Sequence, residues 1–220
     1  MVKRWYYTSR PCGLEEEYME EENKELKNIK ERIMHIALEE FGKNAYKVAS
    51  TNVICKRAEV SKGTLYHYYK SKENIYLDVV IYVINKFKEN IKLQNEDSNK
   101  KGIDYISEYF NSKFKFFGEN PLYSNIIVNL VLDDIPESAR QLANEFEEYN
   151  NGILYEIIKS IDFNPNFERE KAFELIAMIG SKLEEKHMKN LKYKDKDTVI
   201  EDFRQDHKMM IEMLFEGIDK

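Results

Sequence analysis

Glycine and proline are scarce in this chain of 220 residues, which contains 8 of the first and 4 of the second. Turn-rich β-folds and low-complexity disordered segments use both residues heavily, so neither class fits this composition. Apolar residues recur at spacings of three and four almost throughout, and no alternation of apolar and polar residues persists. The pattern therefore predicts an all-α fold.

Cysteines and long apolar runs are also few. Cys12 and Cys55 are far apart in the sequence and indicate neither a disulfide framework nor a zinc site. No apolar run approaches the ~20 residues that a membrane-spanning helix needs, and residues 1–10 lack the apolar core of a signal peptide. We expect a cytoplasmic protein with no metal, no cofactor and no membrane partner.

Charge is distributed unevenly along the chain, whose net charge is −6. Residues 24–72 carry 11 Lys/Arg against 5 Asp/Glu, a net of +6, whereas residues 73–220 carry 20 against 29, a net of −9. A basic module fused to an acidic body favours a polyanionic partner for the module alone. Chance clustering of lysines on a solvated surface is the alternative at this point.

The apolar periodicity predicts helices over residues 25–43, 50–58, 62–69, 72–93, 103–117, 121–132, 137–161, 167–192 and 197–218. The polar stretch 94–102 is the clearest linker. We divide the chain into an N-terminal extension (1–23, expected to be flexible), a basic helical module (24–71) and an acidic helical body (72–220).

Residues 50–74, STNVICKRAEVSKGTLYHYYKSKEN, carry the most informative pattern. Two short helices joined by a turn of three or four residues are not stable alone, and the apolar stripe of residues 25–43 supplies a third helix to cover them. Their inward-facing side chains are expected to be Ile54, Ala58, Val60, Leu65 and Tyr69. Such a unit places its second short helix in the major groove of DNA.

The stretch from Val60 to Glu73 (VSKGTLYHYYKSKE), together with residues 37–41 (ALEEF) and Ile54, closely resembles the DNA-binding domain of the TetR family of bacterial regulators. The resemblance covers about residues 29–77; beyond it, the chain resembles the family only in having about six more helices. It implies a homodimeric, non-enzymatic regulator. Such a protein is most often a repressor that binds a palindromic double-stranded operator and is released by a small-molecule effector.

The resemblance also implies roles for individual residues of the motif. Candidates for contacts with base edges are Lys62, Gly63, Thr64 and His67. Candidates for phosphate contacts are Tyr66, Tyr68 and Lys72, with Ser50 and Thr51 at the start of the first short helix. Leu65, Ile54 and Tyr69 are expected to be core.

Two positions depart from the family's pattern. Ala45 stands where glycine is usual, so we expect Asn44 to adopt the left-handed conformation that ends the preceding helix. Glu59 stands where glycine is usual in the turn, which predicts a positive φ at a cost of roughly 1 kcal/mol. It also places a negative charge near the phosphates.

The acidic body is rich in aromatic residues, most of which are expected to be ordinary core. The residues proposed to face an effector are Tyr105, Tyr109, Phe114, Tyr123, Phe146 and Tyr149. Glu147 or Glu148 is positioned to attract a cation, with simple surface exposure as the alternative. The identity of the effector and the operator sequence stay open.

The last two helices are expected to form the dimer interface. Small residues that allow close approach are Ala172, Ala177, Gly180 and Ser181, and apolar area comes from Leu175, Ile176, Ile179, Leu183, Val199, Phe203, Met210 and Leu214. Packing of these stripes inside one subunit is the alternative. Two other functions remain as rivals: a helical interaction protein, and a small helical enzyme, for which the four scattered histidines offer no catalytic arrangement.

Overall fold

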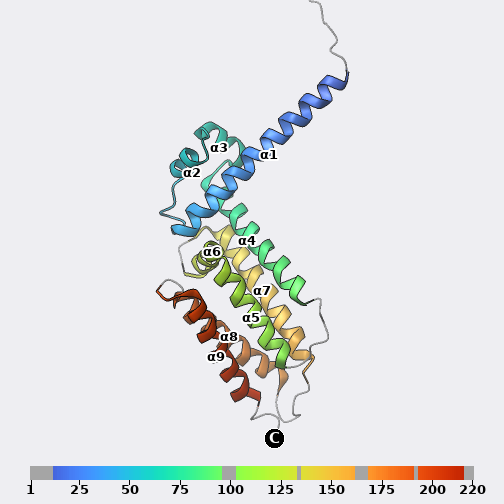
Figure 1. Cartoon of the computed structure of the whole chain (residues 1–220), viewed down its shortest axis with the longest axis vertical. Coiled ribbons are helices and arrows are strands. Elements are labelled where there is room, and N and C mark those ends of the chain that lie inside the picture. Colours follow the sequence, from blue (N-terminus) through green and yellow to red (C-terminus); the bar gives the residue numbers. More distant parts are fainter. Residues whose placement is uncertain (1–11, 96–102, 133–134, 162–167, 191–192, 216–220) are drawn as a thin grey trace, which may run out of the picture.

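A computed structural model describes residues 12–95, 103–132, 135–161, 168–190 and 193–215, and every regular element within them is a helix (Figure 1). The helices are α1 (Cys12–Lys43), α2 (Thr51–Arg57), α3 (Lys62–Tyr69), α4 (Lys72–Asn95), α5 (Ile103–Glu119), α6 (Pro121–Leu132), α7 (Glu137–Lys159), α8 (Arg169–Asn190) and α9 (Lys196–Phe215). The predicted all-α fold is confirmed. None of the described helices is long and apolar enough to cross a membrane.

The largest departure from the expected boundaries is at α1, which begins at Cys12 rather than near residue 25. Residues 12–23, which we expected to belong to a flexible extension, continue this helix. Glu, Leu and Met are strong helix formers and dominate the segment, so its local propensity favours a helix even without an apolar stripe. Residues 1–11 and most of the expected linker (96–102) lie outside the described residues.

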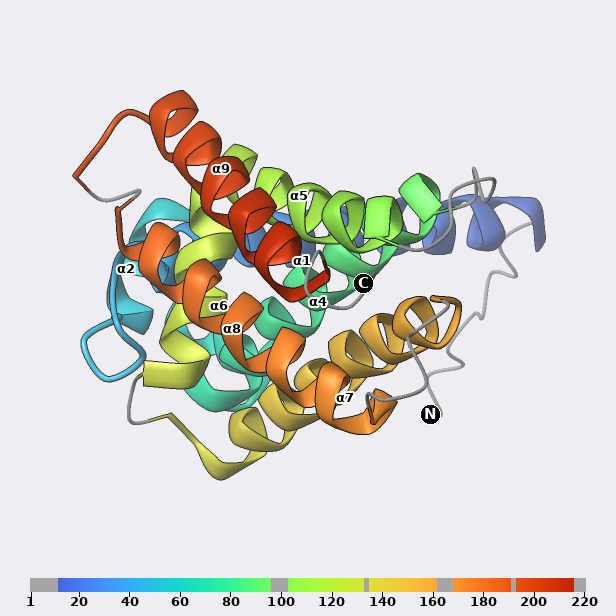
Figure 2. The same ribbon diagram turned by 90° about the horizontal axis from the view of Figure 1, so that it is seen from below.

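Helices α1 to α3 form one end of the molecule, and the first half of α1 projects beyond it (Figure 1). Helix α4 runs from this module into the body, where α5 and α7 lie alongside it. Helices α8 and α9 pack against each other on the far side, and α9 also packs on α5 (Figure 2). The body is therefore a bundle attached to the module through α4 and α6.

Aromatic rings fill much of the interior of the body. Phe87 of α4 is fully buried and stacks on Phe117 of α5, with ring centroids 5.3 Å apart, while Phe146 of α7 meets it edge-on at 5.0 Å. Phe114 of α5 stacks on Phe203 of α9 at 3.9 Å. These ring pairs join α4, α5, α7 and α9 into one core.

One hydrogen bond connects the body to the module, and a second joins α7 to the first turn of α4, directly after the module. The Asn125 side chain of α6 donates to the backbone carbonyl of Gly42 in α1 (2.8 Å), and the Ser138 hydroxyl of α7 donates to a carboxylate oxygen of Glu73 in α4 (2.5 Å). A Cβ on Gly42 would lie 2.9 Å from the Leu122 side chain of α6, so glycine permits this close approach. Helix α6 is thereby fastened to α1 of the module, and α7 to the start of α4.

Candidate nucleic-acid interface

The module is held together by an apolar interior to which all three of its helices contribute. Ile54, Ala58 and Leu65 are fully buried and Tyr69 is 3% exposed, as the sequence pattern predicted. The Arg32 side chain of α1 donates to the carbonyl of Ala58 at the end of α2 (2.9 Å), which fixes α2 against α1. This packing leaves the opposite side of α3 free to face a partner.

The outward side of α3 carries most of the predicted contact residues. Lys62, Gly63 and His67 are exposed, Tyr66 is 39% exposed, and Thr64 is half-buried. The structure therefore brings the four candidates for base contacts to one short helix. Their contact with bases stays a prediction.

The start of α3 is capped by Ser61, whose hydroxyl accepts a hydrogen bond from the Thr64 amide (3.0 Å). The Thr64 hydroxyl lies 2.9 Å from the same Ser61 oxygen, so it is oriented by the cap. A Cβ on Gly63 would meet only Ser61 Oγ, at 3.5 Å. Packing within the chain therefore does not require glycine at 63, and a close approach to a partner would use the space outside it.

A second group of candidates lies where α2 begins. The hydroxyls of Thr51 and Tyr66 are 3.4 Å apart, which places one candidate phosphate contact of α2 beside one of α3. The Ser50 side chain makes no capping bond; instead, its backbone N–H donates to the carboxylate of Glu40 in α1 (2.9 Å). Glu40 is only 7% exposed. A buried carboxylate thus supplies the cap of α2 and leaves the Ser50 hydroxyl for a partner.

The sequence interpretation missed Glu40. Its signal was available: Glu40 falls on the same stripe as Ala37 and Phe41, both buried in α1, where an acidic residue needs a hydrogen-bond donor. Ser50, ten residues later, begins a helix whose first amides lack partners. Pairing the two requires knowing that the chain folds back after α1.

Lys72 and Tyr68 lie at the edge of the candidate interface. The Lys72 ammonium sits over the Tyr46 ring, 4.8 Å from its centroid, and 3.4 Å from the carbonyl of Lys47. Partial burial lowers the pKa of Lys72 from its ordinary value by desolvation. Tyr68 is half-buried and meets the His67 ring edge-on at 5.4 Å. Both residues are held in place within the module, which suits positioning contacts.

Two residues other than glycine have positive φ among those described. Glu59 has φ of 53°, so the prediction for the turn is confirmed. Lys70, at the end of α3, has the same φ and was not predicted. The expectation that Asn44 is left-handed is wrong, because its φ is not positive; its side-chain amide instead donates to the carbonyl of Glu40 (3.1 Å). The Asn44 backbone N–H donates to the same carbonyl at 3.0 Å, so α1 ends without a left-handed residue at this position.

Basic residues surround α2 and α3. Exposed lysines are Lys47, Lys56, Lys62 and Lys70. Arg57 binds the Glu39 carboxylate at 2.7 Å, and Lys43 binds the same group at 3.1 Å. These hydrogen bonds, from Arg57 first and then Lys43, lower the pKa of Glu39. The exposed lysines give this end of the molecule the positive surface that a polyanion requires.

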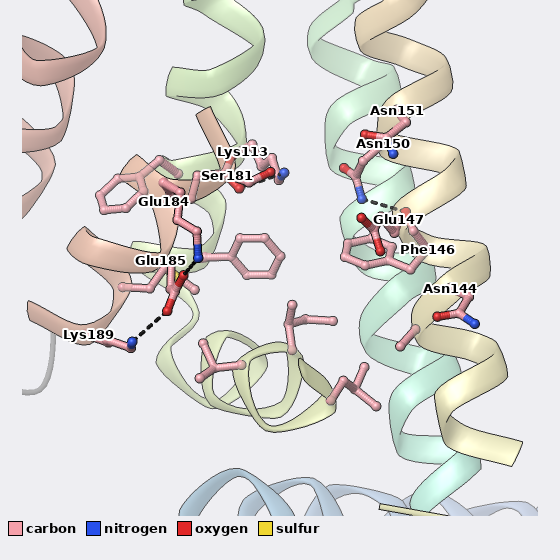
Figure 3. Close-up of a pocket in the computed structure, with 18 of the residues that line it drawn as sticks. Lys113, Asn144, Phe146, Glu147, Asn150, Asn151, Ser181, Glu184, Glu185 and Lys189 are labelled. Atoms are coloured by element: carbon pink, nitrogen blue, oxygen red, sulfur yellow. Dashed lines mark hydrogen bonds and ion pairs between the residues drawn. The ribbon is translucent and has the colours of Figure 1, made fainter. Parts of the chain in front are cut away.

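The body encloses a cavity of about 480 Å³ between α5, α6, α7 and α8 (Figure 3). Of the six residues expected to face an effector, Phe114 and Phe146 line it. The four tyrosines of that set, Tyr105, Tyr109, Tyr123 and Tyr149, are not among its lining residues. Tyr109 is buried and its hydroxyl donates to the Asn150 side chain (3.0 Å), and Asn150 does line the cavity.

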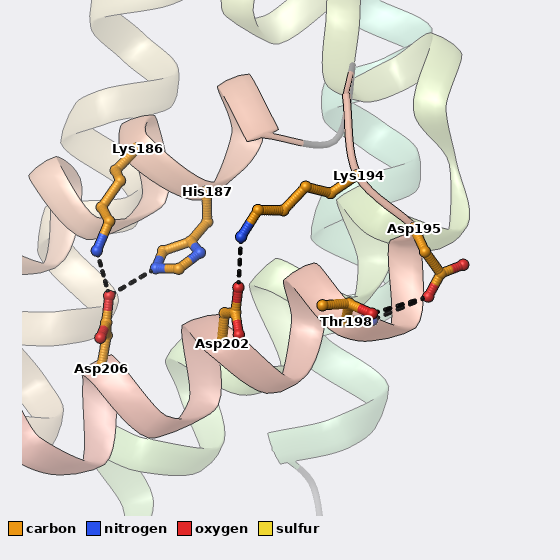
Figure 4. Close-up of polar contacts among 7 residues, drawn as sticks. All are labelled: Lys186, His187, Lys194, Asp195, Thr198, Asp202 and Asp206. Carbon is orange, nitrogen blue, oxygen red and sulfur yellow. Dashed lines mark hydrogen bonds and ion pairs between the residues drawn. The ribbon is translucent and has the colours of Figure 1, made fainter.

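Helices α8 and α9 are held together by polar contacts as well as apolar ones (Figure 4). His187 of α8 is 2% exposed, and its Nε2 lies 2.8 Å from a carboxylate oxygen of Asp206 in α9, which also binds Lys186 at 2.6 Å. Hydrogen bonds from Lys186 and His187 lower the pKa of Asp206. A further ion pair joins Lys194 to Asp202 at 3.0 Å.

The apolar stripe assigned to a dimer interface on α9 requires a correction. Val199, Phe203 and Met210 are between 0 and 6% exposed within one chain, because this side of α9 packs on the body. The Leu214 side chain lies outside the described residues. On α8, the small residue Gly180 accommodates the Phe110 ring of α5 rather than a partner. Large apolar side chains exposed on these two helices are Leu175, Met178, Met209 and Met213.

Comparison with known proteins agrees with this geometry. Residues 33–79 match the family model of bacterial regulatory proteins of the tetR family. The chain is 40% identical over 65 residues to the HTH-type transcriptional regulator QacR of Staphylococcus aureus, a match that covers 30% of this chain and 35% of QacR. It is 29% identical over 136 residues to IcaR of Staphylococcus epidermidis, a negative transcriptional regulator of the biofilm operon icaADBC, which covers 61% and 70% of the two chains.

Among solved structures, FadR of Bacillus subtilis in complex with stearoyl-CoA shares the fold, with a TM-score of 0.63 and 20% identity, over 86% of this chain and 99% of FadR. The three-helix module with its exposed α3, fused to a helical body, defines a helix-turn-helix transcriptional regulator. Over residues 33–79, the module is similar to the DNA-binding domain of the TetR family.

Proposed function

We propose that this protein is a repressor that binds a palindromic DNA operator as a homodimer and leaves it when a small molecule occupies the cavity of the body. The observation that carries the proposal is the exposed side of α3, where Lys62, Gly63 and His67 lie on the surface while Leu65 and Tyr69 of the same helix are buried in the module. A helix held in this way fits the major groove, and the lysines around it suit the flanking phosphates.

The dimer is supported by the exposed apolar side chains of α8 and α9. Leu175 and Met178 are 46% and 58% exposed, and Met209 and Met213 are 60% and 76% exposed. Burying such side chains against a second copy would stabilise the pair through the hydrophobic effect. A two-fold dimer would present two copies of α3 to half-sites about 34–36 Å apart.

Release by an effector is supported by the helices that surround the cavity. Helix α6 lines it and also binds the Gly42 carbonyl through Asn125; helix α7 lines it and binds Glu73 through Ser138. A ligand that displaces either helix would therefore shift the base of the module and the start of α4. The separation of the two α3 helices would change, and the ligand would favour a state that does not bind the operator.

The relatives are consistent with this scheme. IcaR is named a negative regulator, which favours repression, and FadR holds stearoyl-CoA, which shows that this fold accommodates a small organic molecule. A regulator that acts on bacterial operators would work in the cytoplasm.

The experiment that tests the proposal is a titration of the full chain against labelled duplex DNA from the region upstream of its own gene, at several salt concentrations. We expect specific binding whose affinity falls steeply with salt, since phosphate contacts release counterions. A variant with Lys62→Ala and His67→Ala should lose this binding, and Lys182→Ala, an exposed lysine of the body, should keep it.

Two results would count against the proposal. The absence of salt-dependent DNA binding would favour the rival readings, a helical interaction protein or a small enzyme. Equal operator affinity with and without every cavity ligand would remove the release step and leave DNA binding in place.

A further inference from the structure

The cavity has two chemically different ends. Its apolar lining includes Ile127 and Val128 of α6 together with Phe117 of α5. Its sides carry polar groups: Lys113 and Glu184 come from α5 and α8, and α7 contributes asparagines and a glutamate on the opposite side (Figure 3). A ligand that fills this space needs an apolar body and one polar head group.

The cations at the cavity are already paired. Lys113 binds Glu184 at 2.8 Å, with the two side chains only 14% and 17% exposed. Lys182 and Lys189 both bind Glu185 at 2.7 Å. Arg140 lies 3.6 Å from Glu137 in α7. No basic side chain of the described lining is therefore left without a carboxylate.

The acceptors at the cavity are in surplus. Oε2 of Glu184 faces Lys113, but Oε1 is shielded from solvent and has no hydrogen-bond partner among the described residues. Across the cavity, Glu147 is exposed to solvent and makes no ion pair within the described part of the chain. A buried carboxylate oxygen without a donor is unfavourable, and a ligand that brings a donor would relieve it.

We propose that the effector of this cavity is an amphipathic organic cation, with an apolar body on α6 and a protonated amine beside Glu184. This inference rests on the proposed function, because it names the ligand class of the same cavity. Rotation about the terminal bond of Glu184, which is a soft torsion, presents one oxygen to Lys113 and the other to the amine. Glu147 adds negative potential from the opposite side.

An anionic head group fits the same space less well. To bind Lys113 it would have to displace Glu184, leaving that carboxylate with both oxygens unpaired in a partly buried wall. Desolvating an unpaired carboxylate is more costly than adding a donor to one that is already bound. The charge arrangement therefore favours the cation over the anion.

The test compares three ligands that share one tail and differ in the head group: n-octylamine hydrochloride, 1-octanol and sodium octanoate. Calorimetric titration of the full chain at neutral pH, without DNA, measures each affinity. We expect the amine to bind about tenfold more tightly than the alcohol, as a charge-assisted hydrogen bond provides, and the carboxylate to bind least tightly.

Three variants locate the effect. Glu184→Gln should remove the preference for the amine and bring its affinity to that of the alcohol. Glu201→Gln, which alters a carboxylate of α9 outside the cavity that binds Arg204 at 2.7 Å, should keep the preference. Val128→Trp should fill the apolar part of the cavity and weaken the binding of all three ligands.

The proposal is overturned if octanoate binds most tightly, if the three ligands bind equally, if none binds, or if Val128→Trp leaves amine binding intact. Should Glu184→Gln fail to fold, the ranking of head groups on the unaltered chain and the Val128→Trp result still decide. Operator affinity measured without ligand tests the proposed function separately, so a failure of one is distinguishable from a failure of the other.

Discussion

The module and the body differ in what they place inside. Among the described residues, the buried polar or charged side chain of the module is Glu40, which caps α2. The body buries Ser124, Asn150, His187 and His207, and Asn150 lines the cavity. The module therefore presents its polar groups outward, where a rigid surface meets a partner. The body directs part of its polarity inward, as an internal binding site requires.

The largest expected effect comes from removing apolar volume at the centre of the module. Leu65→Ala should lower the free energy of unfolding of the module by about 2–5 kcal/mol, because Leu65 is fully buried in the core. Operator binding should be lost with it. Thermal unfolding followed by circular dichroism measures the change.

The matched control is Val48→Ala, at a site that is 70% exposed, which should change stability by less than about 0.5 kcal/mol. If Leu65→Ala also lowers the unfolding temperature of the body, the two regions unfold as one unit, and the division between them fails at the level of stability.

The next effect belongs to the body alone and depends on pH. His207 is 1% exposed, packs against the rings of Phe110 and Phe203, and burial lowers its pKa to about 4. The folded state therefore binds the His207 proton less readily than the unfolded state, whose pKa is about 6.5. Stability is complete above pH 6.5 and falls as the pH drops toward 4, by up to about 3 kcal/mol.

Urea titrations of the body transition between pH 7 and 4.5 measure this loss. His207→Leu should flatten the pH dependence in that range, whereas His67→Leu, an exposed site on α3, should leave it unchanged. Equal slopes for the His207→Leu variant and the unaltered chain would mean that another group is responsible.

A smaller effect is expected on the surface of the module. Tyr66→Phe should weaken operator binding by about 1–2 kcal/mol, the range of a hydrogen bond to a charged phosphate, without unfolding the domain. Fluorescence anisotropy with labelled operator measures the affinity. Tyr155→Phe is a control of the same exposure, 38% against 39%, on the body. Unchanged operator affinity in Tyr66→Phe would remove Tyr66 from the phosphate contacts.

The smallest effect concerns backbone strain. Glu59→Gly should raise the free energy of unfolding by about 1 kcal/mol, because φ of 53° is unfavourable for a residue with a side chain. It should also strengthen operator binding by removing a negative charge. Lys70→Gly, at the same φ, should stabilise equally but should not strengthen binding, since it removes a positive charge. Opposite changes in stability for the two variants would show that φ is not the cause.

The sequence predicted the module better than the body. The motif of residues 50–74 determines both the helices and the side of each that is buried, so the burial of Ile54 and Leu65 and the positive φ of Glu59 were all predicted. The prediction that Asn44 is left-handed was wrong, because its φ is not positive and its side-chain amide donates to the carbonyl of Glu40. Local propensity does not distinguish these two ways of ending a helix.

In the body, the apolar periodicity predicted the helices but not which helices pack against one another. The apolar stripe of α9 packs inside one subunit, which was the alternative to a dimer interface. It packs on α5, as the stacking of Phe203 on Phe114 shows. Whether a side chain faces a cavity depends on the packing of four helices far apart in sequence. Tyr109 and Phe114 lie on the same helix, yet only Phe114 lines the cavity.

The buried carboxylate of Glu40 has a consequence for how the module assembles. Helix α2 has seven residues, too few to persist alone, and its first amide is bound by a residue of the preceding helix. The Ser50 amide should therefore exchange its proton with solvent slowly only while α1 and α2 are docked. Hydrogen exchange at the Ser50 amide would therefore report whether the three helices are assembled in the absence of DNA.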